Sequence, residues 1–171
     1  MDRGQIWIEA VLYIGIGVTV LVLVLSAGIP LLNRIRDENT VTQTRDVMIA
    51  LDSNIRTVIG EGAGSQRIFS MEVSRGVLKV NQEEDVLFWE METEAEVVEI
   101  DSPGVHIGNL VLSEEKTGTS GIYLVRLKLS YSGLTDIIES DESGFLGRND
   151  LIIKNIEAKP DTLPKISINP R

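Results

Sequence analysis

Residues 10–33 read AVLYIGIGVTVLVLVLSAGIPLLN, a stretch without one charged side chain. It follows MDRGQIWIE (residues 1–9), whose last residue, Glu9, is a lone carboxylate at the head of the apolar run. As a helix, residues 10–32 span about 34 Å, and the hydrocarbon core of a bilayer is about 30 Å thick. The sequence therefore predicts a helix over residues 10–32 that lies in a membrane or in an assembly derived from one.

The helical pattern continues past the apolar run. Its apolar seam, at spacings of three and four residues, consists of Val41, Thr44, Met48, Leu51, Ile55 and Val58. The other, solvated faces carry Asp37, Glu38, Arg45, Asp46, Asp52 and Arg56. Gly60, Gly62 and Gly64 end the pattern. We predict one helix over residues 5–60 whose seam packs on the chain's own β domain, with packing against neighbouring subunits as the alternative.

Pro30 lies inside this predicted helix. Proline lacks an N–H and its ring clashes with the backbone one turn earlier, and Gly28 adds to the local weakness. We therefore expect the helix to kink or open locally near Pro30. Arg34 and Arg36 follow the apolar run and continue the helical pattern, which disfavours an ordinary cleaved secretory signal.

After Ser65 the apolar period changes from that of a helix to that of a strand. Strands are expected at residues 67–73, 77–80, 85–92, 105–112, 122–131 and 151–156. Residues 74–76 (SRG) and 114–121 (EEKTGTSG) read as hairpin turns, and the proline-rich tail from Lys159 as an extended segment or edge strand. The predicted fold class is α+β, a long N-terminal helix followed by an antiparallel β-sheet domain over residues 65–171.

Charge and cysteine content narrow the function classes. Residues 61–171 carry eleven Lys/Arg against twenty Asp/Glu, so this part is strongly acidic. Binding to nucleic acid or to anionic lipid needs clustered basic side chains, and the acidic domain argues against both. The chain has no cysteine, which excludes disulfides, thiolate metal sites and cysteine nucleophiles.

Little in the sequence suggests catalysis. His106 is the only histidine and lies in a strand-like context, and neither a G-x-S-x-G elbow nor a G-x-x-x-x-G-K phosphate loop occurs. We predict no enzyme and no cofactor. Asp136, Asp141 and Asp150, in DIIESDESGFLGRND (residues 136–150), are weak candidates for binding a hard cation such as Ca²⁺, against the commoner alternative of a metal-free acidic loop.

The first nine residues carry the most specific pattern. Arg3 and Gly4 precede Gln5, and Glu9 is the fifth residue counted from Gln5. This resembles the class III signal peptide of archaeal type IV pilin-like proteins, in which a short basic leader ends in Gly, the mature chain begins with Gln, and a Glu follows at its fifth position. The resemblance covers residues 1–30; Trp7 departs from it, because the family often has Ser at that position.

The resemblance implies how the protein is processed and used. A prepilin peptidase would remove the leader, residues 1–4, between Gly4 and Gln5. The subunit would then leave the membrane and join copies of itself in a surface filament, with the help of an assembly platform and an ATPase. Its β domain would be extracellular, and adhesion or surface attachment would be the outcome.

The charges at this end fit that use. Cleavage after Gly4 creates a cationic α-amine on Gln5, and Glu9 of the same or another subunit can neutralise it in an apolar surrounding. The simpler alternative is a plain membrane anchor, with Glu9 at the interface. Two other functions stay open: a single-pass membrane protein whose extracellular β domain binds a ligand, and a minor pilin or secretion-system pseudopilin.

Overall fold

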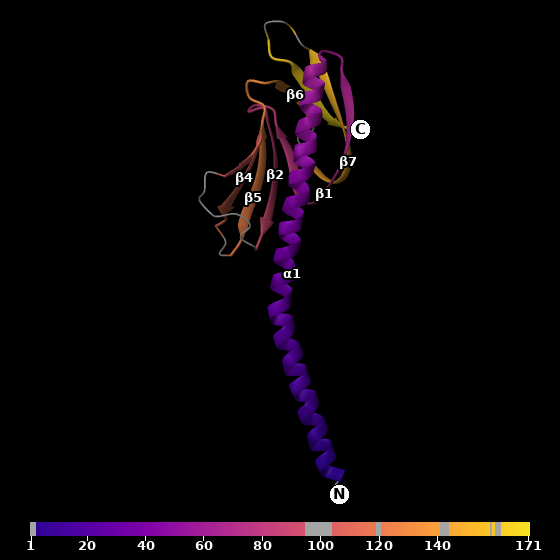
Figure 1. Ribbon diagram of the computed structural model, residues 1–171, viewed down its shortest axis with the longest axis vertical. Coiled ribbons are helices and arrows are strands. Elements are labelled where there is room, and N and C mark those ends of the chain that lie inside the picture. The colour runs from indigo at the N-terminus through magenta and orange to yellow at the C-terminus, as the bar shows by residue number, and fades with distance from the viewer. Residues whose placement is uncertain (1–2, 95–103, 119–120, 141–143, 158, 160–161) are drawn as a thin grey trace. The chain divides into compact units, whose positions relative to one another are not determined.

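The computed structural model describes residues 3–94, 104–118, 121–140, 144–157, 159 and 162–171 (Figure 1). Along the chain the described residues form one helix and then one sheet of eight strands. The fold class is therefore α+β, as predicted. The chain divides into two compact units, Met1–Arg36 and Asp37–Arg171, and the boundary falls within the helix.

Helix α1 runs from Arg3 to Glu61, within two residues of the predicted ends. The backbone stays helical through Pro30, and the kink expected there stays a prediction. Gly62 and Gly64, with φ of 89° and 88°, adopt the left-handed conformation that glycine tolerates best after a helix end.

The eight strands follow the helix in one sheet. They are β1 (Gln66–Asn81), β2 (Val86–Thr93), β3 (Val105–Ile107), β4 (Leu110–Lys116), β5 (Tyr123–Ser130), β6 (Asp136–Ser140), β7 (Phe145–Glu157) and β8 (Lys165–Pro170). Their order across the sheet is β3-β4-β5-β2-β1-β7-β8-β6. All described neighbours pair antiparallel except β6 and β8, which are parallel.

The seam of α1 packs into the core of the second unit, which confirms the favoured alternative. All six of its side chains are at most 4% exposed. Its apolar members share one core cluster with residues of the sheet, among them the fully buried Trp89 and Tyr131. Alternate residues of the strands point into this core. The alternation of apolar and polar residues from which the strands were predicted therefore reflects the two faces of the sheet.

The hairpin predicted at residues 74–76 is wrong, because β1 is one long strand with an irregularity at that point. Residues 66–73 pair with β7, and residues 77–81 pair with β2 on the other edge. Gly76, at φ 75°, bends the strand, and a Cβ there would lie 2.4 Å from the Glu90 carbonyl oxygen. The Ser-Arg-Gly sequence therefore joins two halves of the sheet through one strand.

The second predicted turn, at residues 114–121, is correct only in part: residues 114–116 still belong to β4, and the connection to its neighbour β5 begins after Lys116. The strand predicted at residues 105–112, however, is a hairpin of its own. β3 and β4 are joined at Gly108 and Asn109, and Gly108 has φ of 63°. Two-residue hairpin turns require a positive φ, and glycine and asparagine adopt it at little cost. Gly-Asn is therefore a common hairpin connection.

The C-terminal tail is not an edge strand. The strand of this tail, β8, lies between β7 and β6 and pairs with both. The edge position belongs to β6, which was not predicted as a strand. The Ile137 backbone N–H of β6 donates to the Asp85 carboxylate at 2.8 Å, a contact between residues far apart in sequence.

Candidate functional site

The first unit presents an apolar helix surface. Eighteen large apolar side chains from Trp7 to Ile35 are exposed. Burying one such side chain is worth about 1.5 kcal/mol or more, so leaving this surface in water costs tens of kcal/mol. This is the one helix among the described residues that is long and apolar enough to cross a membrane, and it lies near the N-terminus.

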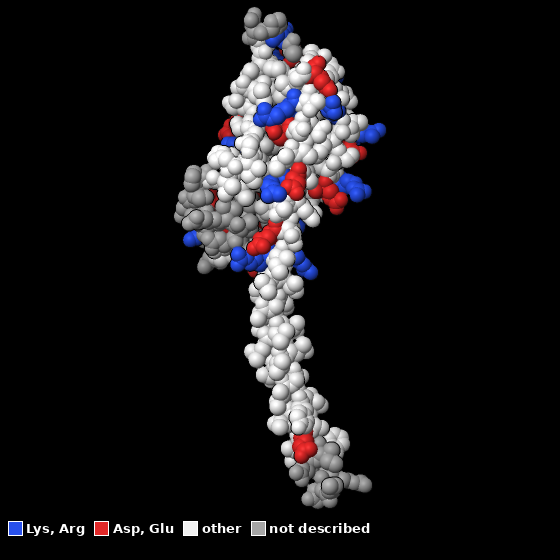
Figure 2. Space-filling view, in the orientation of Figure 1, with Lys and Arg blue, Asp and Glu red and all other residues white. Residues whose placement is uncertain are grey.

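Charge is nearly absent from this surface. In Figure 2 the apolar part of the helix is white apart from one acidic group near its N-terminal end. The sequence has one acidic residue in this part, Glu9, and its side chain is exposed. Gly4 and Gln5 lie in the first turn of α1, so Glu9 follows Gln5 by about one helical turn.

A shallow apolar hollow interrupts the same helix surface at Gly15. It is lined by Val11, Leu12, Gly15, Ile16, Thr19 and Val20. The Thr19 hydroxyl donates to the Gly15 carbonyl at 2.8 Å, so its polar hydrogen is satisfied within the helix. A small residue at such a position allows close approach of another helix.

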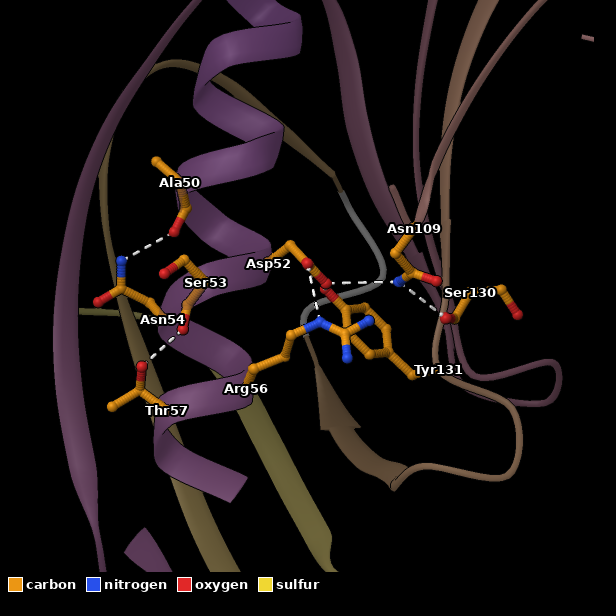
Figure 3. A network of polar contacts seen from close by, with 9 residues as sticks. All are labelled: Ala50, Asp52, Ser53, Asn54, Arg56, Thr57, Asn109, Ser130 and Tyr131. Atoms are coloured by element: carbon orange, nitrogen blue, oxygen red, sulfur yellow. Dashed lines mark hydrogen bonds and ion pairs between the residues drawn. The ribbon is translucent and has the colours of Figure 1, made fainter. Parts of the chain in front are cut away.

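In the second unit, Asp52 of α1 is the centre of a polar network (Figure 3). The Tyr131 hydroxyl donates to Asp52 Oδ1 at 2.9 Å, and Arg56 Nε donates to Asp52 Oδ2 at 2.9 Å. Asn109 Nδ2 donates to Asp52 Oδ1 at 3.3 Å and to the Ser130 carbonyl at 3.0 Å. The network therefore fixes this face of α1 to the β3–β4 turn and to the end of β5.

Burial and the neighbouring Asp52 carboxylate both raise the pKa of the Tyr131 phenol above its usual range. Burial is the larger cause, because it disfavours the charged phenolate. Tyr131 is therefore held as a neutral hydrogen-bond donor, which is a structural role.

Asp37 was predicted on a solvated face of the helix, and this is wrong. The residue is 4% exposed. One carboxylate oxygen forms an ion pair with the Arg75 guanidinium, and the other accepts a hydrogen bond from Thr93 Oγ1 at 2.6 Å. The seam could have revealed this position, since Asp37 precedes Val41 by four residues and continues the same spacing.

The weak metal candidates do not come together in the described residues. Asp136 begins β6 opposite Lys165, and Lys165 is opposite Glu157 at the end of β7. Asp150 lies seven residues before Glu157 in β7. At about 3.3 Å per residue, that is a separation of about 20 Å along the strand. Asp141 lies outside the described residues. The part of the chain that the structure describes contains no group of three or more metal-binding side chains.

Two further features bear on binding and catalysis. His106 lies exposed on the edge strand β3, and its imidazole makes no hydrogen bond or ion pair with the described residues. A groove of about 890 Å³ lies beside α1, β1 and β7. Its charged lining residues are three acidic ones, Asp46, Glu72 and Asp150, and one basic one, Arg148; apolar atoms also line it.

Comparison of the chain with models of protein families, with curated proteins and with solved structures found no match. Function therefore has to be argued from the residues and the geometry alone.

Proposed function

We propose that the chain is a structural subunit of a type IV pilus-like surface filament. It is made as a prepilin, cut between Gly4 and Gln5, and assembled through its N-terminal helix. Its role is adhesion or surface attachment. The observation that carries the proposal is the apolar helix surface of the first unit, which is exposed in the single chain although α1 continues into a folded acidic domain.

Such a surface needs an apolar surrounding, and either lipid or other copies of the helix can supply it. A permanent anchor needs lipid alone. A filament subunit uses both in turn: the helix is held in the membrane first and is then buried against copies of itself. The Gly15 hollow would let another helix approach closely, which assembly through the helix uses and anchoring in lipid does not require.

Glu9 distinguishes the two uses further. A carboxylate at the end of an apolar segment is costly without a counter-charge. Cleavage after Gly4 would supply one, the α-amine of Gln5, about one turn earlier on the helix. Pairing between subunits would also fix the register of neighbouring helices.

The partners follow from this use. They are further copies of the chain, a prepilin peptidase, an assembly platform with its ATPase, and the membrane before assembly. The acidic domain would lie outside the cell, and neither nucleic acid binding nor catalysis is part of the proposal.

The N-terminus of the native protein tests the processing step. Mass spectrometry of the protein isolated from its cells is expected to find a chain that begins at Gln5. A chain that still begins at Met1 would overturn the proposed cleavage.

Glu9→Gln tests assembly separately from processing. The variant is expected to be cut normally and to reach the membrane, but to be depleted at least tenfold from sheared surface filaments. Glu61→Gln, which makes the same change at the far end of α1, is the matched control and should assemble normally. Normal incorporation of the Glu9 variant would contradict the pairing.

A second candidate function is a membrane-anchored binding module. The groove beside α1, β1 and β7 favours it, because its volume lies in the range of ligand-binding pockets. This alternative predicts an uncut chain that stays in the membrane, whereas a cut chain that is absent from filaments would indicate a minor pilin or secretion-system pseudopilin.

A further inference from the structure

The Asp37 carboxylate stands at the point where α1 becomes part of the folded domain. From residue 7 onward, Asp37 is the first buried side chain of the helix. It is also the first residue of the second compact unit. Four residues later Val41 begins the apolar seam, so Asp37 occupies the seam position nearest to the first unit.

The partners of Asp37 lie on two strands of the sheet; the Arg75 side chain is 51% exposed, but its backbone is fixed to the core. Arg75 lies at the irregularity of β1, and its carbonyl accepts a hydrogen bond from Trp89 Nε1 at 2.9 Å. Trp89 is fully buried, and Thr93 is 3% exposed at the end of β2. The carboxylate is therefore bound by two neighbouring strands whose positions the core determines.

Pro30 lies seven residues before Asp37 in the same helix. Because proline removes one backbone hydrogen bond, opening of the helix is least costly around this residue. Asp37 is the first buried side chain that opening reaches when it spreads from Pro30 toward the C-terminus. There it must break an ion pair and a hydrogen bond to a buried carboxylate, and each such loss is costly.

We propose that Asp37, held by Arg75 and Thr93, is a stop that confines opening of α1 to the residues before it. The first part of the helix can then bend or open while the seam from Val41 onward stays packed on the sheet. This holds whether the first part lies in lipid or in a filament, so it does not depend on the proposed function.

Amide hydrogen exchange of the full chain in detergent micelles tests the stop, with Asp37→Asn as the main variant. Loss of the ion pair is expected to speed exchange of residues 38–47 about tenfold, as the strength of a hydrogen bond to a charged group indicates. Residues 51–58 and the strands should exchange as in the unchanged protein. Thr93→Val, which removes the hydrogen bond to Asp37 and leaves the ion pair with Arg75, should give a smaller increase over the same residues.

Asp46→Asn is the matched control, because it removes a carboxylate that is 63% exposed on the same helix. It should leave exchange of residues 38–47 unchanged. The proposal is overturned if Asp37→Asn has no effect on these residues. It is equally overturned if exchange rises by the same factor throughout the sheet, since Asp37 would then add only to overall stability.

Discussion

Replacing Gly76 by alanine tests the conclusion that residues 74–76 lie within one strand. The new Cβ would lie 2.4 Å from the Glu90 carbonyl oxygen and 2.6 Å from Trp89 Nε1, on a backbone with φ of 75°. The left-handed conformation costs alanine about 1 kcal/mol. Relief of the contacts costs about 2 kcal/mol, as overpacking does, and loss of the Trp89 hydrogen bond to Arg75 about 1 kcal/mol. The expected loss is about 4 kcal/mol.

Gly147→Ala is the matched control. Gly147 has nearly the same φ, 76°, but nothing lies within 4 Å of its added Cβ. Only the conformational cost of about 1 kcal/mol should remain. The difference of about 3 kcal/mol therefore isolates the close contact of β1 with β2.

Urea unfolding of the full chain in a mild non-ionic detergent measures both variants. A Trp7→Phe background leaves Trp89 as the only tryptophan, so its fluorescence reports on the core of the second unit. With an m value of about 2 kcal/mol per molar urea, the midpoint should fall by about 2 M for Gly76→Ala and about 0.5 M for Gly147→Ala. Equal shifts would refute the bent strand, because a glycine in an open hairpin turn has no such contact.

Two further predictions concern the packing of α1. The raised pKa of Tyr131 means that the folded state keeps this phenol neutral, while the unfolded chain ionises it near pH 10. The contribution of Tyr131 to the free energy of unfolding should therefore be complete below pH 10 and decrease above it. Tyr131→Phe should lower the free energy of unfolding by about 1 kcal/mol at pH 7 and reduce its decrease above pH 10, as measured by urea unfolding. An unchanged pH dependence would contradict this account. Leu51→Ala, at a fully buried seam position, should cost about 3 kcal/mol, and Ile49→Ala, at 41% exposure, less than about 1 kcal/mol by the same assay. Similar losses at the two positions would mean that the seam does not face the sheet.

The long helix was predictable because its signals are local. An uninterrupted apolar run, a seam with regular spacing and three closely spaced glycines all act within a few residues of one another. The same holds for the strands that alternate clearly, such as β5, where Val125, Leu127 and Leu129 face the core.

The errors arose where pairing between distant residues decides the structure. A glycine at residue 76 is compatible with a hairpin turn or a bent strand, and only the two different partners of β1 distinguish them. β6 is short, and it is held by β8, whose residues lie almost thirty positions later in the chain. Without that pairing in view, the acidic sequence around β6 resembled that of a loop.

Of the candidate site, the apolar helix surface was predictable from the sequence, and the buried position of Asp37 was not. The apolar run and Glu9 are visible in the sequence, because the length of an uncharged apolar stretch is a property of its composition alone. The buried setting of Asp37 was missed because a charged residue is expected in water, and its partners Arg75 and Thr93 come from distant strands. Only the spacing of the seam pointed to it.

The position of β8 has a consequence for the order in which the domain can form. β6 and β7 are both made before β8, yet each borders it in the finished sheet. Until residues 165–170 have left the ribosome and crossed any membrane, β6 lacks its described neighbour and β7 has one open edge. This half of the sheet can therefore be completed only after residues 165–170 have been translated, and a shortened chain that ends before Lys165 would expose two strand edges to aggregation.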